Sequence, residues 1–162
     1  MGFQDLRHYR APEGDVEMLS FPVTASQSFV AGEPVVVTAA GTLSACADDP
    51  SAVDGIAAHK SSDRRGTDLG VGHPVTVYGT SKSQIFITKN FATDGSGTAA
   101  TPAITNVGDL AGYELTSGTW SVDIGQNNLI LQIVGVQDAA GNDLGNPNIL
   151  PGTGVWVLYR HI

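Results

Sequence analysis

Short apolar runs separated by turn-forming residues fill the chain from Val16 onward, and this pattern limits the fold more than any other feature. No stretch shows a sustained 3.6-residue apolar period, so we expect helices to be few and short, with a single helical turn possible at 48–53. The runs have the length and composition of β-strands. The predicted strands cover 16–24, 34–39, 42–46, 53–59, 74–80, 84–90, 112–116, 119–124, 129–137 and 155–161.

The residues between these runs favour hairpins. Glycine, asparagine or serine occurs at 40–41, 116–118, 125–128 and 140–143. These residue types supply the positive φ angles that tight turns require. The strands are therefore expected to pair mainly antiparallel.

Alternation within the strands indicates which faces are buried. Trp120, Val122 and Ile124 alternate with Ser121 and Asp123. We expect the first set to face a core and the second to face solvent.

Two predicted strands are apolar on both faces. Residues 129–136 and 155–159 have almost no alternating polar positions, which is typical of central strands covered on both sides. The second of these lies late in the chain, and we expect it to lock the fold.

The 162 residues fit one domain, because a typical domain contains roughly 100–200 residues. We predict an all-β fold: a compact antiparallel barrel or sandwich over 16–162, preceded by an extended N-terminal arm over 1–15. Segments 61–72 and 92–102 are predicted to be long loops, the second mobile unless a partner orders it.

The N-terminal fifteen residues have two interpretations. A frayed terminus is the default for any chain end. The alternative is an arm that docks on a neighbouring subunit, with Phe3, Leu6 and Tyr9 as apolar anchors and Arg7 and Arg10 donating to acidic groups. These five residues are the candidate interface site.

The charge balance argues against two classes of partner. The chain has 8 basic and 16 acidic residues, a formal net charge of −8, so binding to nucleic acid or to an anionic membrane is not expected. Charged residues make up only 15%, below the usual value of about 25%. A weakly charged surface is easier to bury against another protein, because few charges lose their hydration.

Cys46 is the single cysteine, so no intramolecular disulfide can form, and we expect a small buried core residue. The sequence contains neither the apolar run of a signal peptide nor one of about 18 residues for a membrane helix. The prediction is a soluble protein that folds in a reducing cytoplasm.

The sequence contains no recognisable constellation for catalysis. His8, His59, His73 and His161 lack metal-ligand spacing, and a structural zinc would need several cysteines or histidines. The segment 94–97 (DGSG) resembles a serine nucleophile motif but lacks the strand before it and the helix after it. We therefore predict a protein that is not an enzyme, with no catalytic residue, cofactor, metal or small-molecule substrate.

Two weaker alternatives involve a ligand. Asp138, Asn142 and Asp143 surround a glycine and could form a calcium loop, although turns use the same residues for local backbone bonding. Trp120 and Trp156 could stack on sugars in a carbohydrate-binding or hydrolytic β-domain, although both lie in apolar strand patterns that favour a core position.

Three consecutive motifs carry a family resemblance. Segment 29–37 (FVAGEPVVV) is followed by 41–45 (GTLSA) and then by 53–58 (VDGIAA), and 72–77 and 154–159 have the same style. The order of Gly-Glu-Pro-Val, a glycine turn and Gly-Ile-Ala resembles the small β-rich head decoration, or cement, proteins of tailed bacteriophages.

This resemblance implies a structural virion protein on the capsid exterior, made in the host cytoplasm. Such proteins bind the major capsid protein and clamp neighbouring capsomers, often as homotrimers with an N-terminal arm making the contact. The alternatives are another phage structural component, such as a tail tube, head fibre or baseplate part, or the carbohydrate-binding domain considered above.

Overall fold

The computed structural model describes residues 6–10, 15–61, 73–146 and 152–162. Within these ranges the chain forms strands, one short 3-10 helix and no α-helix. The elements are β1 (Arg7–Arg10), β2 (Met18–Pro22), β3 (Pro34–Val37), β4 (Leu43–Ala45), β5 (Gly55–Ala57), β6 (Pro74–Gly79), β7 (Ile85–Thr88), β8 (Phe91–Ala92), η1 (Ile104–Asn106), β9 (Leu110–Thr116), β10 (Thr119–Asp123), β11 (Leu131–Gln137) and β12 (Trp156–His161). Each predicted strand range overlaps one of these strands. The expected helical turn at 48–53 is absent, and η1 is the short helix instead.

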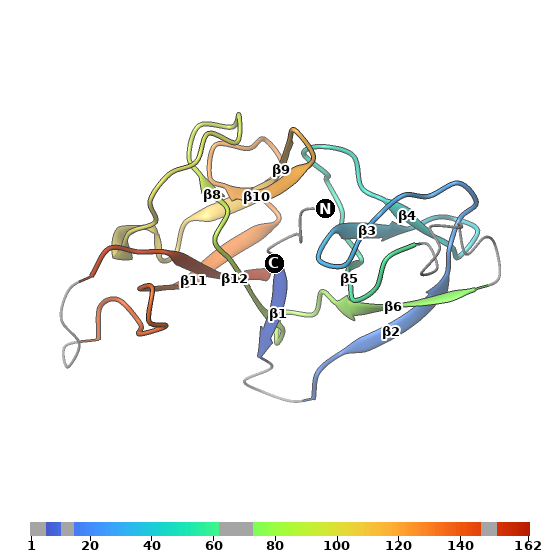
Figure 1. The fold of residues 1–162 in the computed structure, drawn as a ribbon, viewed down its shortest axis with the longest axis horizontal. Helices are drawn as coiled ribbons and strands as arrows, with labels where there is room; N and C mark the ends of the chain where they lie inside the picture. The colour runs from blue at the N-terminus through green and yellow to red at the C-terminus, as the bar shows by residue number, and fades with distance from the viewer. Residues whose placement is uncertain (1–5, 11–14, 62–72, 147–151) are drawn as a thin grey trace.

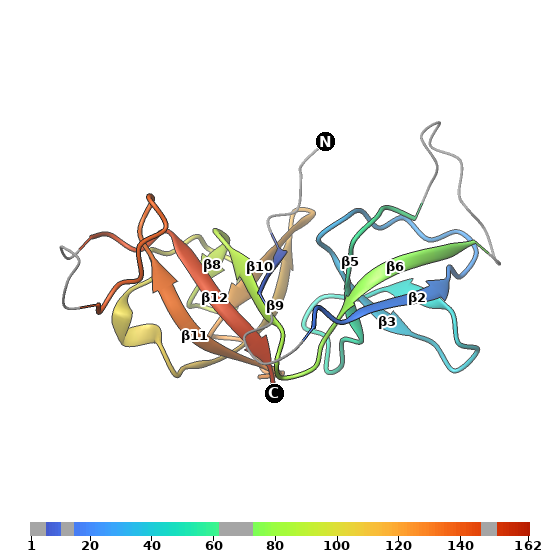
Figure 2. The same cartoon turned by 90° about the horizontal axis from the view of Figure 1, so that it is seen from below.

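The strands form two sheets (Figure 1). One has the order β1-β7-β12-β11-β9-β10-β8 and the other the order β2-β6-β5-β3-β4. Every pairing between these strands is antiparallel except β8–β10. Figure 2 shows the five-stranded sheet beside the strands of the larger one. The predicted all-β fold is confirmed, and it consists of two packed sheets rather than a closed barrel.

The central core lies between the two sheets. Phe86, Tyr113 and Tyr159 from the larger sheet belong to the same buried cluster as Leu6 and Ile56. Fully burying a side chain of this size contributes roughly 1.5–3 kcal/mol relative to its exposure. A smaller cluster lies within each sheet. The shared cluster is what joins the sheets into one unit.

Two turns illustrate what the sequence pattern captures. Ser117 and Gly118 have φ angles of 52° and 78°, as a two-residue hairpin turn between β9 and β10 requires. The prediction of positive φ at 125–128 is wrong. Gly125 is needed for a close approach instead, since a Cβ there would lie 2.3 Å from the backbone nitrogen of Gly95.

The predicted faces of β10 are half right. Trp120 and Val122 are buried in the central core as expected, with 2% and 0% exposed. Ser121 and Asp123 were expected to face solvent, but they are 7% and 0% exposed. The loop that precedes Ala99 covers this face, and the N–H of Gly97 donates to the Asp123 carboxylate (3.3 Å).

The two strands predicted to be covered on both faces also differ. β12 lies between β7 and β11, and Val157, Leu158 and Tyr159 are all buried. β11 is central as predicted, but Val134 is only half-buried and Leu129, just before the strand, is 40% exposed. One face of β11 is therefore only partly covered.

Candidate interaction site

Part of the predicted N-terminal arm is a strand of the chain's own sheet. β1 pairs antiparallel with β7, with an irregularity in register between His8 and Arg10. Leu6 is 1% exposed and lies in the central core. Leu6 therefore packs in the core of its own chain and is not available as an anchor for a neighbouring subunit. Phe3 lies outside the described residues.

The other predicted anchors lie along β1. Arg7 begins the strand and is exposed, and Arg10 ends it. Tyr9 is 42% exposed, and its hydroxyl oxygen accepts a hydrogen bond from Nε2 of Gln137 (3.2 Å). The structure thus leaves the side chains of Arg7 and Tyr9 at the surface of a fixed strand.

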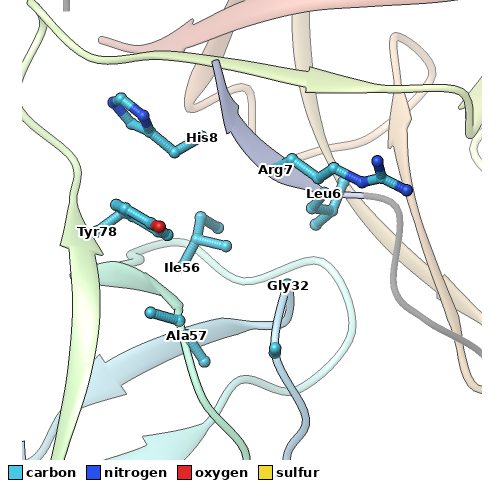
Figure 3. A pocket seen from close by; sticks show the side chains of 9 residues that line it. Leu6, Arg7, His8, Gly32, Ile56, Ala57 and Tyr78 are labelled. Carbon is cyan, nitrogen blue, oxygen red and sulfur yellow. The ribbon is translucent and has the colours of Figure 1, made fainter. Parts of the chain in front are cut away.

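A pocket of about 350 Å³ lies between β1 and the five-stranded sheet (Figure 3). Its wall is mainly apolar, and Arg7 and His8 are its basic residues. The lining residues are Leu6, Arg7, His8, Ala31, Gly32, Ile56, Ala57, Ala58 and Tyr78. Arg7 and His8 belong to β1 and Leu6 directly precedes it, so this strand and its start form one side of the pocket.

His8 is held in place by stacking and by a buried amide. Its ring stacks on Tyr78, with 4.9 Å between ring centroids, and its Nε2 lies 2.7 Å from Oε1 of Gln84. Nε2 of Gln84 donates to the carbonyl of Asp15 (3.1 Å), so Oε1 is the acceptor and the His8 ring donates. This arrangement fixes β1 against the start of β2 and uses the His8 Nε2 proton for structure.

A second histidine lies inside the core. His161 is 6% exposed, and its Nε2 lies 3.0 Å from the hydroxyl oxygen of Tyr113. Burial lowers the pKa of His161 to about 3, and burial raises the pKa of Tyr113 and of Tyr159 above the usual range. All three groups are therefore neutral at pH 7, and they pack as part of the core.

Buried carboxylates lie on β9 and on the face of β10 that the sequence pattern assigned to solvent. Glu114 accepts hydrogen bonds from Gln126 and from the hydroxyl of Thr116. Asp123 accepts from the N–H of Gly125 (2.7 Å) as well as from Gly97. Both carboxylates thus serve to anchor neighbouring loops. Sequence alternation missed them because a polar residue on every second position is also the pattern of an exposed face.

The two glycine-containing loops with acidic residues are closed by their own hydrogen bonds. Hydrogen bonds from Thr98 and Ser96 lower the pKa of Asp94 to about 2. Oδ1 of Asp138 accepts from the N–H groups of Ala140 and Asn142, each at 2.9 Å. Across the described ranges, no group of three or more His, Cys, Asp or Glu side chains is arranged to hold a metal.

The tryptophans offer little open ring surface. Trp120 is 2% exposed and lies in the central core. Trp156 is partly buried, and Nζ of Lys89 lies 4.4 Å from its ring centroid. An ammonium over the ring occupies the position that a stacked sugar would take.

No protein-family model, curated protein or solved structure matches this chain. In the part of the chain that the structure describes, no helix is long and apolar enough to span a membrane.

Among the described residues, the exposed large apolar side chains other than Tyr9 occur in three separate groups along the chain. The first comes from β2 and the residues before it, the second from η1 to the start of β9, and the third from just before β11 and just after β12. The members are Val16, Met18 and Leu19; Ile104, Val107 and Leu110; and Leu129 and Ile162, each 37–55% exposed. Single exposed apolar residues are common, but groups of them mark contact surfaces.

Proposed function

We propose that this chain is a structural protein of a tailed-bacteriophage particle, which binds the capsid exterior and holds neighbouring capsid subunits together. The observation that carries the proposal is the presence of three separate groups of exposed apolar side chains on a weakly charged molecule. A protein that joins several neighbours needs several contact surfaces, and each can be modest because simultaneous contacts raise avidity.

The motifs behind the resemblance support the same proposal. Segments 29–37, 41–45 and 53–58 form the β3–β4–β5 part of the five-stranded sheet. Within it, a Glu33 carboxylate oxygen accepts the N–H of Val30 (3.2 Å), and the Glu33 carbonyl accepts the N–H of Ala57 (2.9 Å). The shared residues thus build a scaffold. The trimeric state and the major capsid protein as partner belong to the proposal through the resemblance.

The N-terminal strand contributes to the proposed contact through Arg7 and Tyr9, which are exposed. Deleting the first twelve residues would be a poor test, because it also removes Leu6 from the core and β1 from its sheet. Point substitutions at exposed positions separate binding from folding.

The experiment measures attachment of the purified chain to phage particles that lack it. Val107→Asp with Leu110→Asp is compared with a matched pair of charge additions at exposed positions outside the apolar groups, Thr101→Asp with Thr119→Asp. We expect at least 10-fold weaker attachment for the apolar pair and a near-normal value for the control. The proposal is refuted if the Val107/Leu110 aspartate pair attaches as well as the control pair, and the corresponding aspartate pairs in the other two apolar groups do so too. Assembly of the free chain into rings or stacks would favour a tail tube.

A further inference from the structure

The edge strands of the two sheets differ in how they are protected. β1 has an irregular register and an arginine at each end. β8 has two residues and is followed by a bridge between Ala92 and Ala99. β4 has three residues, and its Leu43 carbonyl accepts the N–H of Thr24 (2.9 Å). Short length, charge, bulges and covering segments are the usual ways to prevent edge-to-edge pairing. β2 has a proline only at its last position, Pro22, and among the described residues no charged residue, bulge or covering segment lies along Met18–Phe21.

The backbone of β2 offers hydrogen-bonding groups to a new strand. The carbonyl of Glu17 accepts the N–H of Gly79 (2.9 Å), and the N–H of Val23 donates to the carbonyl of His73 (3.3 Å). Odd-numbered residues therefore face β6, and antiparallel alternation directs the N–H and C=O groups of residues 18 and 20 away from it. Neither residue has another hydrogen-bond partner in the described chain.

The side chains along this edge are apolar except for Ser20. Val16, Met18 and Leu19 are 45%, 55% and 37% exposed. Glu17 directly precedes β2, but its Oε2 accepts the N–H of Ser81 (3.2 Å), so its carboxylate is turned back toward its own sheet. An incoming strand would meet an apolar edge.

We propose that β2 pairs antiparallel with β2 of a second copy of this chain, about a two-fold axis that passes at Leu19. In this register Met18 of each copy lies opposite Ser20 of the other, and their outward backbone groups exchange hydrogen bonds. Leu19 lies opposite Leu19 of the partner copy, and Val16 lies opposite Pro22. Each exposed apolar residue of the edge is thereby covered.

Self-complementarity is the argument for a second copy as the occupant. A two-fold contact uses the same surface on both copies, and here each donor position is matched by an acceptor at the related position. Charge favours the same orientation. Antiparallel pairing places Asp15 and Glu17 of the two copies at opposite ends of the contact, whereas parallel pairing would bring like charges side by side. The pairing is a contact of the free protein that is separate from the trimeric state implied by the resemblance, and it does not depend on the proposed capsid binding.

Cysteine cross-linking tests both the pairing and its register. Residues at the two-fold axis form a non-hydrogen-bonded pair with Cα atoms about 4.5 Å apart, within the range for a disulfide. We expect Leu19→Cys to form a disulfide-linked dimer under mild oxidation at least 10-fold faster than Met18→Cys. The Met18 positions are offset by two residues in this register, so Met18→Cys is the matched control. Native Cys46 is buried and does not compete. Equal rates for the two variants, or no dimer from either, would overturn the proposal.

A second experiment measures self-association of the full chain by sedimentation equilibrium. Ser20→Pro removes the outward N–H without touching a bond to β6, and Ser20→Ala keeps that N–H. We expect at least 10-fold weaker association for Ser20→Pro than for Ser20→Ala, because each pair of copies loses two donors. Circular dichroism checks that both variants fold. If Ser20→Pro does not fold, the cross-linking experiment decides the proposal. If neither the chain nor its variants self-associate, and substitutions in β2 abolish attachment to particles, this edge binds the capsid protein instead.

Discussion

Nε2 of His161 lies 3.0 Å from the hydroxyl oxygen of Tyr113, while Nδ1 of the same ring has no hydrogen-bond partner among the described residues. A neutral imidazole tolerates this position because it carries no charge to be desolvated. A protonated ring would be a buried cation with one unsatisfied donor. Protonation of His161 therefore destabilises the folded state.

The first prediction concerns stability against pH. The folded pKa of His161 is about 3 and the unfolded value is 6.5, so below pH 6.5 the unfolded chain binds a proton that the folded chain does not. The contribution of neutral His161 to the free energy of unfolding is fully present above pH 6.5. It is lost as the pH falls toward 3, by up to about 1.4 kcal/mol per pH unit. Urea unfolding from pH 7 to pH 5 should show a shallower dependence for His161→Gln.

The second prediction separates two buried hydroxyl groups. The Tyr159 hydroxyl has no hydrogen-bond partner within the described chain, whereas Tyr113 is bonded to His161. Tyr159→Phe should leave the free energy of unfolding unchanged or raise it by up to about 1 kcal/mol. Tyr113→Phe should lower it by about 1–3 kcal/mol, because it leaves the ring nitrogen unpaired. The hydrogen-bond assignment fails if the two variants are equally stable.

The third prediction tests the close approach at Gly125. A Cβ there would lie 2.3 Å from the nitrogen of Gly95 and 2.7 Å from the carbonyl carbon of Asp94. Since backbone atoms cannot move aside cheaply, Gly125→Ala should destabilise by more than about 2 kcal/mol. Gly41→Ala is the control, because its Cβ meets nothing within 4 Å and only its φ of 74° is unfavourable. A loss of about 1 kcal/mol is expected there.

The fourth prediction concerns Gln84, which is 1% exposed and is bonded to His8, Glu17 and Asp15. Gln84→Leu keeps a similar volume but leaves three groups without their partner. Thermal unfolding should show a loss of about 2–4 kcal/mol. In this variant, backbone amide hydrogen exchange should accelerate more in β1 than in β11, because the side-chain amide of Gln84 holds β1 in place. Uniform acceleration across the sheet would argue against that local role.

Local patterns predicted most of the strands, and non-local packing explains what they missed. β1 was assigned to an arm because its arginines, histidine and tyrosine do not look like a buried strand. Its inward residue is His8, next to the buried Leu6 that precedes the strand, and His8 becomes favourable inside only because Tyr78 and Gln84 lie beside it. Neither neighbour is close to His8 in the sequence.

The candidate surface was predictable only in part. Tyr9 and Arg7 were identified and are exposed, whereas Leu6 was identified and is buried. The apolar edge at Met18 and Leu19 was assigned to a strand, but no sequence pattern says which strand lies at the edge of a sheet. That position follows from the order of strands, which is a property of the whole chain.

β7 pairs with β1 on one side and with β12 on the other, so the earliest and the latest described strands lie on either side of one strand from the middle of the chain. A chain emerging from the ribosome can form β2 to β6 early, but the sheet that receives β1 is incomplete until β12 has been made. Sequence-distant contacts of this kind slow folding. The β1–β7–β12 part of nascent chains should therefore stay protease-sensitive until β12 has been synthesised, whereas the β2–β6 sheet can become resistant earlier.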